Sequence, residues 1–487
     1  MKEETQETGR VQYRDLREWL ELVEKAGQLR RVKGARAKDE IGPITEMVTR
    51  TDEAPVVMFS DIPGYPEGHR VVVNSLANSL RLGLTFGLPT ELSRVEMSMQ
   101  MGQRLKSLDT MPPVVVDGGP VTENVLMGQD VDLGLIPVPL WHEDDGGPYI
   151  GTGSFDITKD PDTGLVNLGT YRVMAHDKNH VGFYISPGKH GRIHRDKWFA
   201  RGERMPVAIV CGADPLLFLS GCTEVPLGVT EYEWAGGLRG FPYRVFPGRV
   251  TGLPLPADAE IVLEGWAYPD VSQREGPFGE WAGYYASGAR EEPVVEVEAM
   301  YFRNDPILVG SPPMRPPDEQ ARFRAFLRSA LLKDEMEKAG VPGVQAVWAH
   351  EVGGTRLFLA VGIRQQYPGH ARQAGFVASQ CHVGAYTGRF VVVVDDDIDV
   401  SDLGHVVWAM STRCDPAEDI DIIRRAWSTP LDPRISPEDR QRGKFMNSRA
   451  IIDATRPWEW RDKFPRVNEA KPELRESTLA KWGWILR

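Results

Sequence analysis

The chain alternates between segments with helical spacing of apolar residues and short apolar runs typical of strands. Residues 13–32 carry one helical pattern that ends at Gly27; its apolar positions are Leu16, Trp19, Leu20, Leu22 and Val23. VVMF at 56–59 and VVV at 71–73 predict strands, and residues 92–105 predict a further helix. These elements predict a small α/β domain, which we place at residues 1–112.

The middle of the chain has a different pattern of apolar and turn-forming residues. In residues 113–315, short β-rich runs such as PVAIVCG, EIVLEG and PVVEVEAMYF alternate with turns rich in glycine and proline. No long helical pattern interrupts them, so we expect a barrel or a sandwich. Val295, Val297, Ala299 and Tyr301 alternate with glutamates, which predicts a strand with one buried and one wet face.

Helical spacing returns after Pro316-Pro317, where a third domain begins and extends over residues 316–487. A helix is predicted from Asp318 to a stop at Gly340. The apolar run at 391–394 predicts a central strand covered on both faces. The tail at 472–487 is rich in apolar side chains, so we expect it to dock on this chain or on a partner subunit.

Composition narrows the class of protein. A hydrophobic share of 41% with 26% charged residues is ordinary for a globular protein, and a net charge of -12 disfavours generic binding to nucleic acid or anionic lipid. Four cysteines without a CxxC pair predict neither a disulfide framework nor a structural zinc site. The polar start and the lack of a long apolar run argue against a signal peptide and a membrane span, so we expect a cytoplasmic protein.

Two glutamates flank a tight turn in REGPFGEWAGYY, at residues 274–285. Glu275 and Glu280 lie five residues apart, a spacing that diverges on a helix, and Gly276-Pro277 would stop a helix there. A turn therefore sets their geometry. The plain alternative is that Glu275 pairs with Arg274 or another surface cation while Glu280 caps a strand.

Other polar segments give weaker signals. No G-x-G-x-x-G follows a strand and no G-x-x-x-x-G-K-[ST] occurs, so the dinucleotide fingerprint and the P-loop are both absent. DDDIDV at 395–400 looks like a metal cluster, but acidic residues after a parallel strand usually cap the next helix. HEDDGG at 142–147 is interpreted mainly as structural in the same way.

The arrangement as a whole resembles the UbiD family of reversible decarboxylases that use prenylated FMN. The likeness covers nearly the whole chain and is carried, in family order, by NLGTYRVMAHDKNH, SPGKHGRIH, VTEYEWAG, PADAEIVLEG, EGPFGEWAGY and DDDIDV. It implies an α/β (α+β) fold: a central β-rich split-barrel flavin-binding domain, flanked by an N-terminal α/β domain and a C-terminal α/β oligomerisation domain. It also implies a homodimer or homohexamer.

The resemblance implies reversible, non-oxidative decarboxylation of an aromatic or heteroaromatic, α,β-unsaturated acid. Loss of CO2 from an sp2 carbon would leave an unstable carbanion, so the family uses a flavin whose extra ring forms a covalent adduct and accepts the electrons. By the family pattern Arg172 orients the substrate carboxylate, Glu275 holds Arg172, and Glu280 donates the proton. A flavin prenyltransferase must supply the cofactor.

The family pattern also implies the residues that bind the cofactor: Thr152, Ser154, Asn167, Thr170, Tyr171, Arg172, Lys189, His190 and Glu231. Asn167, His190 and Glu231 fall on the ligand positions of a divalent metal, Mn2+ or Mg2+, with K+ or Na+ beside it. Their spacing alone would not identify them as ligands. Some members carry a phosphate-binding lysine before the DDDID strand; here His382 and Val383 stand there, and Lys189 is the candidate replacement.

Arg324, Thr429 and Leu431 are implied to line the substrate pocket. An arginine on that wall favours a polar aromatic or heteroaromatic acid over a cinnamate-like one, unless Arg324 points away and pairs on the surface. A phenylacrylic or 4-hydroxybenzoate-type decarboxylase and a non-catalytic flavin-binding subunit are the alternatives within the family. A glycoside hydrolase with Glu275 and Glu280 as acid and base is the alternative from another class.

Overall fold

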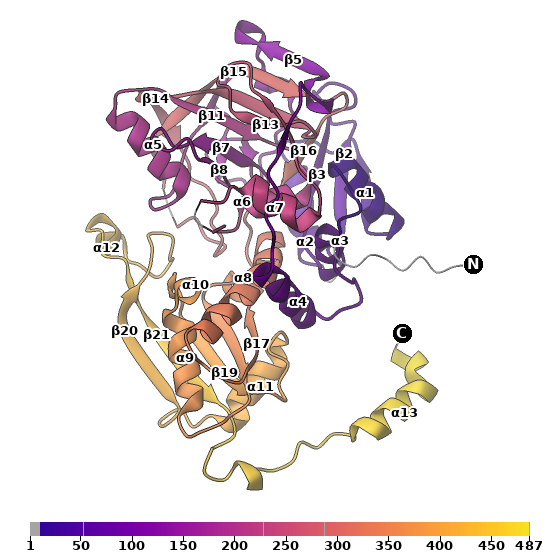
Figure 1. The fold of residues 1–487 in the computed structure, drawn as a ribbon, viewed down its shortest axis with the longest axis vertical. Coiled ribbons are helices and arrows are strands. Elements are labelled where there is room, and N and C mark those ends of the chain that lie inside the picture. Colours follow the sequence, from indigo (N-terminus) through magenta and orange to yellow (C-terminus); the bar gives the residue numbers. More distant parts are fainter. Residues whose placement is uncertain (1–9, 52, 227, 287, 487) are drawn as a thin grey trace.

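The helix α8 (Glu319–Lys338) lies between two bodies of the structure, an upper one that holds the N-terminal and central elements and a lower one that holds the rest (Figure 1). The computed structural model describes residues 10–51, 53–226, 228–286 and 288–486. Within this part of the chain no helix is both long and apolar enough to cross a bilayer.

The N-terminal elements are α1 (Leu16–Lys25), β1 (Leu29–Lys33), α2 (Ile41–Thr49), β2 (Val56–Ser60), β3 (Arg70–Val73), α3 (Ser79–Phe86) and α4 (Arg94–Lys106). The predicted helices and strands are confirmed within a few residues. Gly27 follows α1 with φ +71°, a left-handed conformation that glycine adopts without strain. The sheet order is β1-β2-β3-β16, so β16 (Ile307–Gly310), distant in sequence, completes it beside β3.

The central body is built on a seven-stranded sheet with the order β10-β15-β14-β11-β7-β8, and β5 pairs with β15 off this path. Its strands are β5 (Asn124–Met127), β7 (Phe155–Lys159), β8 (Val166–Gly169), β10 (His180–Gly182), β11 (Met205–Val210), β14 (Ile261–Glu275) and β15 (Arg290–Phe302). Smaller sheets are made by β4 (Val114–Val115), β12 (Arg244–Pro247) and β13 (Pro254–Pro256), and by β6 (Tyr149–Gly151) and β9 (Val173–Met174). In β15 the predicted alternation of buried apolar residues and partly exposed glutamates is confirmed.

This region also contains short helices that the apolar pattern did not predict. It contains α5 (His190–Ala200), α6 (Pro215–Gly221) and α7 (Glu231–Arg239). Residues 215–220 of α6 are all buried, so buried and exposed positions do not alternate along this helix with a 3.6-residue period. The sequence of α5 is mostly polar. It has too few apolar residues to show helical spacing.

The lower body is a five-stranded sheet in the order β17-β18-β19-β21-β20 with helices on both faces. Its elements are β17 (Val344–Ala349), β18 (Phe358–Ile363), α9 (His370–Gln380), α10 (His382–Ala385), β19 (Phe390–Asp395), α11 (Leu403–Arg413), β20 (Ile420–Trp427), α12 (Pro437–Gln441) and β21 (Met446–Ala454). Val391 and Val393 pack into one core cluster, and Val392 and Val394 into the other. The predicted doubly covered strand is therefore confirmed.

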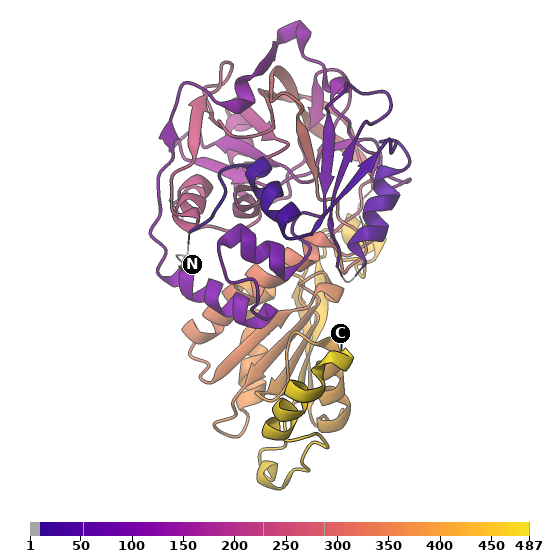
Figure 2. The ribbon, with the colours of Figure 1, turned by 90° about the vertical axis from the view of Figure 1, so that its right-hand side faces the viewer.

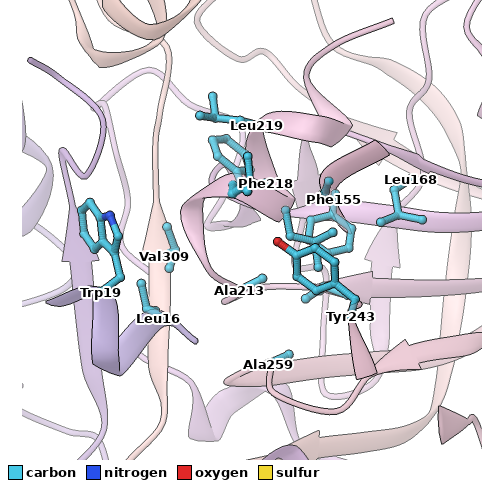
Figure 3. Packing of buried hydrophobic residues seen from close by; sticks show 14 of the residues in the cluster. Leu16, Trp19, Phe155, Leu168, Ala213, Phe218, Leu219, Tyr243, Ala259 and Val309 are labelled. Atoms are coloured by element: carbon cyan, nitrogen blue, oxygen red, sulfur yellow. The ribbon is translucent and has the colours of Figure 1, made fainter. Parts of the chain in front are cut away.

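One hydrophobic cluster anchors α8 to the upper body. Figure 3 shows Trp19 of α1, Phe218 of α6 and Val309 of β16 in this cluster, which also includes Phe323 of α8. The rings of Phe218 and Phe323 meet edge to face, with centroids 5.8 Å apart. As predicted, α8 begins after Asp318, whose carboxylate accepts a hydrogen bond from the Ala321 amide.

The tail does not dock on the described part of this chain. Its helix α13 (Pro472–Trp482) extends away from the lower body in Figure 1, and Figure 2 shows it from the side. Leu474, Trp484 and Leu486 are 61%, 67% and 73% exposed. Docking on a partner subunit stays a prediction.

Candidate active site

Arg172 lies between the two glutamates of the turn. Arg172 lies in the segment between β8 and β9, and Glu275 is the last residue of β14. Arg172 Nε and Nη2 donate to the two Glu275 oxygens at 2.8 Å each, and Nη1 donates to Glu280 Oε1 at 2.8 Å. The three side chains are 9%, 1% and 11% exposed. A surface ion pair is thus excluded for Glu275.

The backbone of the turn brings the carboxylates to the same side. Gly276 has φ +84°, which a residue with a Cβ rarely adopts. The HEDDGG loop packs directly on this turn: the Gly146 amide donates to Pro277 O, and a Cβ on Gly146 would lie 2.1 Å from Gly276 O. Asp145 of that loop accepts hydrogen bonds from the His142 amide and the Tyr285 hydroxyl, consistent with the structural interpretation of HEDDGG.

Aromatic side chains hold the arginine and the glutamate in place. The Tyr149 hydroxyl donates to Glu275 Oε1 at 2.8 Å, and its ring packs against the tilted ring of Phe278 with centroids 3.9 Å apart. The Arg172 guanidinium lies 4.5 Å from the Tyr184 ring and 5.7 Å from the Phe278 ring. The family resemblance places Tyr149 near the flavin, but sequence reasoning gave Tyr184 and Phe278 no role, although Phe278 lies inside the motif itself.

Electrostatics keep Arg172 charged. Burial alone would lower its pKa, but the hydrogen bonds and charge of Glu275 and the charge of Glu280 outweigh burial and raise the pKa above its ordinary value. A guanidinium fixed in this way presents a permanent cation with defined donor directions, suited to binding a carboxylate.

The three residues implied as metal ligands come together. His190 Nδ1 lies 3.2 Å from Asn167 Oδ1, and Glu231 Oε2 accepts a 2.7 Å hydrogen bond from the amide of Leu168, the neighbour of Asn167. Asn167 lies on β8, His190 begins α5 and Glu231 begins α7. The three residues come from segments 23 and 41 residues apart, and spacing along the chain does not show that these segments lie near one another.

The donor set fits a hard divalent cation. Burial raises the pKa of Glu231 to about 7, and the buried amide nitrogen of Asn167 has no partner among the described residues. A nearby cation would favour the ionised carboxylate, and an amide oxygen, an imidazole and a carboxylate suit Mn2+ or Mg2+. The described residues contain no group of three His, Cys, Asp or Glu side chains that could hold a metal, so such a site here depends on Asn167.

The remaining implied flavin residues border the same region. The buried Ser154 hydroxyl lacks a hydrogen-bond partner within the described chain, and Thr152 Oγ1 accepts from the Ser311 amide. The Thr170 amide donates to Gly221 O, and the Tyr171 hydroxyl accepts from the Gly191 amide of α5. Ser154 therefore has an unused hydrogen-bonding group on a buried side chain.

Lys189 precedes His190 and forms an ion pair with Glu224 at 3.2 Å. Glu224 also accepts from His382 Nε2 at 2.9 Å, so the residue that stands in the family lysine's place shares a carboxylate with Lys189. The Lys189 side chain is 52% exposed, and desolvation by the surrounding protein lowers its pKa against the opposing attraction of Glu224.

The three implied substrate-pocket residues come from two parts of the chain, and their joint role stays a prediction. Arg324 on α8 is half-buried and forms no ion pair within the described residues, so the surface-pair alternative is not observed. Thr429 and Leu431 lie in the turn between β20 and α12, where Thr429 Oγ1 accepts from the Leu431 amide. No described hydrogen bond joins this turn to Arg324 or Arg172.

The acidic run DDDIDV has a structural role different from the expected one. Asp395 and Asp397 bind the buried Arg413 at the end of α11, at 3.0 and 2.9 Å. The cap of α11 is instead Asp402, which accepts from the amides of Gly404 and His405. The expectation that the run caps the next helix is therefore wrong, because Arg413 supplies a stronger, charged partner.

Comparison with known families matches three domain models along the chain. They are the 3-octaprenyl-4-hydroxybenzoate carboxy-lyase N-terminal domain at residues 20–98, the Rift-related domain of the same UbiD enzymes at residues 114–316, and their C-terminal domain at residues 321–454.

Two curated proteins are similar over most of their length. The pyrrole-2-carboxylic acid decarboxylase of Pseudomonas aeruginosa is 32% identical over 457 residues, covering 91% of each chain. The phenolic acid decarboxylase of Sedimentibacter hydroxybenzoicus is 32% identical over 464 residues, covering 91% of this chain and 92% of the relative.

Among solved structures, the UbiD-class enzyme HmfF from Pelotomaculum thermopropionicum in complex with FMN superimposes with a TM-score of 0.84 at 29% identity, covering 96% of this chain and all of the other. An evolved dimeric form of HmfF in complex with prFMN gives a TM-score of 0.81 at 28% identity over the same shares.

Proposed function

The chain belongs to the UbiD family of carboxy-lyases, and from that premise we propose that it reversibly removes CO2 from an aromatic or heteroaromatic carboxylic acid with prenylated FMN as cofactor. The observation that carries this proposal is the buried Arg172 held by Glu275 and Glu280. The FMN and prFMN complexes of HmfF support the choice of a flavin.

Arg172 binds and orients the substrate carboxylate. A guanidinium has five N–H donors, and the two glutamates take three of them here. The remaining donors can bind a carboxylate without any rearrangement of the Glu275 pair. Glu275, with Tyr149 behind it, therefore acts as the rigid support of Arg172.

Glu280 moves the proton. Glu280 accepts one hydrogen bond from Arg172, whereas Glu275 accepts two, so the pair of Arg172 with Glu280 is the weaker of the two. A substrate carboxylate that competes for Arg172 would weaken this ion pair and favour protonation of Glu280. The protonated acid then donates to the carbon from which CO2 leaves.

The bound flavin supplies an acceptor for the electron pair left on the substrate carbon. Asn167, His190 and Glu231 would hold Mn2+ or Mg2+ at its phosphate, with K+ or Na+ alongside. Thr152, Ser154, Thr170, Tyr171 and Lys189 would contribute polar contacts, and the unpaired Ser154 hydroxyl fits this role.

A polar aromatic acid is the proposed substrate class. The two relatives named for pyrrole-2-carboxylic and phenolic acids support it, as does the half-buried charge of Arg324. A glycoside hydrolase is disfavoured, because both carboxylates bind a single arginine rather than stand apart around a sugar.

The test is CO2 release by protein co-expressed with a flavin prenyltransferase, over a panel of pyrrole, furan, phenolic and cinnamic acids. We expect release from the polar acids and its loss in Glu280→Gln. Glu298→Gln, at a partly exposed glutamate of β15, should leave release unaffected. Retained flavin without CO2 release from any acid would favour a non-catalytic flavin-binding subunit.

We further propose that the protein acts as a homodimer or homohexamer, without nucleic-acid or membrane partners. The exposed apolar tail supports self-association. A monomer in light scattering at micromolar concentration would contradict this.

A further inference from the structure

The HEDDGG loop contacts the turn that carries Glu280 on both sides of this glutamate in the chain. Before Glu280, Pro277 O accepts a 2.8 Å hydrogen bond from the Gly146 amide. After Glu280, the Tyr285 hydroxyl donates to Asp145 Oδ1 at 3.1 Å. The loop therefore holds both ends of the turn that bears the proposed proton donor.

Asp145 is the centre of these contacts. Its side chain is fully buried, whereas the preceding Glu143 and Asp144 are exposed. Its Oδ2 accepts a 3.0 Å hydrogen bond from the His142 amide and lies 3.4 Å from His142 Nδ1. Desolvation, followed by the charge of Asp145, raises the pKa of Tyr285, so the Tyr285 hydroxyl keeps the proton that it donates. A buried carboxylate bound mainly by neutral donors costs stability, so packing alone does not account for an acid at this position.

The loop and the turn also meet at two glycines of the turn. A Cβ on Gly279, the residue before Glu280, would lie 3.9 Å from Nδ1 and Cε1 of His142, so the imidazole ring borders the turn there. A Cβ on Gly146 would lie 2.1 Å from Gly276 O, so at this point the two backbones are in direct contact. A displacement of the loop would therefore displace the turn.

The two glutamates are supported in different ways. Glu275 accepts two hydrogen bonds from Arg172 and a third from Tyr149, so its carboxylate is fixed by its own side-chain contacts. Glu280 accepts a single hydrogen bond from Arg172. A side chain bound at one oxygen can rotate about that contact, so the direction of the Glu280 carboxyl group depends on the backbone of the turn. Asp145 lies where it can control that backbone.

We propose that Asp145 is a positioning residue for the proton-transfer step, which fixes the turn through Tyr285 and so directs the Glu280 carboxyl group at the substrate carbon. The inference rests on the proposed decarboxylation and deepens it by giving the HEDDGG loop a role in catalysis. Asp145 itself neither gives nor takes a proton. Its effect is on geometry, and a misplacement of about 1 Å can cost roughly 100-fold in rate.

The experiment measures CO2 release by protein co-expressed with a flavin prenyltransferase, in H2O and in D2O. Tyr285→Phe removes one hydrogen bond and should lower kcat roughly 5-fold, while KM for the acid and the flavin content stay unchanged. The solvent deuterium isotope effect on kcat should rise, because proton transfer becomes slower relative to the other steps. Tyr284→Phe, at the 63% exposed neighbour in the same turn, is the matched control and should leave all four quantities unchanged.

Two further sets of variants test the loop itself. Asp145→Ala should lower kcat by at least about 10-fold, and Asp145→Asn, which keeps one acceptor oxygen, should fall between Asp145→Ala and the wild type. Gly146→Ala would force a methyl group against Gly276 O and should lower kcat roughly 100-fold. Gly147→Ala is its control, because the added methyl group first meets the flexible Met174 side chain, at 3.3 Å.

The outcomes separate the inference from the proposed function. Unchanged kcat in both Tyr285→Phe and Asp145→Ala would overturn the inference alone. A parallel loss of kcat, flavin content and thermal midpoint would also overturn it, because the loop would then only stabilise the fold. Tyr285→Phe and Asp145→Asn decide the question even where Gly146→Ala does not fold. A wild type that retains flavin and releases no CO2 from any acid would overturn the proposed function, and the inference with it.

Discussion

Tyr149 donates a 2.8 Å hydrogen bond to the same Glu275 oxygen that receives Arg172 Nε. The tyrosine lies on β6 and the glutamate ends β14, so an otherwise distant strand stabilises the support of the arginine. This contact makes Tyr149 a positioning residue, because it acts on Arg172 only through Glu275.

Tyr149→Phe should lower kcat by roughly 10- to 150-fold, since one buried hydrogen bond to a charged group is worth about 1.5–3 kcal/mol. KM for the acid and the amount of retained flavin should change little. Tyr268→Phe, at a partly exposed position paired with Arg204, is the control. An equal loss of flavin and activity would instead indicate a purely structural role.

Arg172→Lys should reduce kcat/KM by at least about 100-fold, because a lysine cannot bind Glu275 bidentately and present further fixed donors at the same time. CO2 release under saturating flavin measures the effect. The thermal unfolding midpoint of the variant tests whether the new lysine still pairs with the buried glutamates. A lysine variant with near wild-type kcat/KM would contradict the proposed role of Arg172.

His190→Ala and Glu231→Gln should lower affinity for Mn2+ by at least about 10-fold, because each removes one proposed ligand. Metal content after dialysis and FMN affinity with and without EDTA provide two readouts. His180→Ala, a partly exposed histidine paired with Asp177, is the control. If FMN binding is insensitive to EDTA in the wild type, the metal proposal is wrong.

Glu319 gives a prediction for pH. Burial raises its pKa from an ordinary 4.5 to about 7, so between these values the folded state holds a proton that the unfolded state has released. This group therefore favours the folded state below about pH 4.5, and that contribution is lost as the pH rises towards 7. Its full size is about 3 kcal/mol.

Glu319→Gln removes this titration. Relative to the wild type, the variant should gain unfolding free energy as the pH rises from about 4.5 to 8, measured by urea denaturation at several pH values. Asp334→Asn, which removes a half-buried carboxylate paired with Lys338 later in the same helix, should show no such rise. If the difference in unfolding free energy between Glu319→Gln and the wild type does not change with pH, the raised pKa of Glu319 is contradicted.

Removal of residues 472–487 should weaken self-association, because the exposed apolar side chains of α13 are lost. The stability of the remaining chain should be unchanged, since α13 packs on nothing else that the structure describes. Analytical ultracentrifugation of the full and shortened chains measures the shift. Identical oligomeric states would show that the tail serves another purpose.

Much of the fold was accessible from pattern alone. The α/β class is confirmed, and the caps and stops around Asp318 and Gly27, with the double burial of residues 391–394, follow from local chemistry and periodicity. The helices α5, α6 and α7 were missed, because a fully buried or mostly polar helix leaves no 3.6-residue alternation.

The sequence by itself determined which chemical groups were available: a glycine turn that orients two carboxylates, an arginine, and a set of possible oxygen and nitrogen ligands. Only the tertiary structure decided how they pair, because strand register and helix packing bring together residues far apart in the chain. Arg172 meets Glu275 across 103 residues, and Arg356 reaches Trp281 from another body of the molecule. Distances of this kind depend on the whole packed core, so no local pattern contains them.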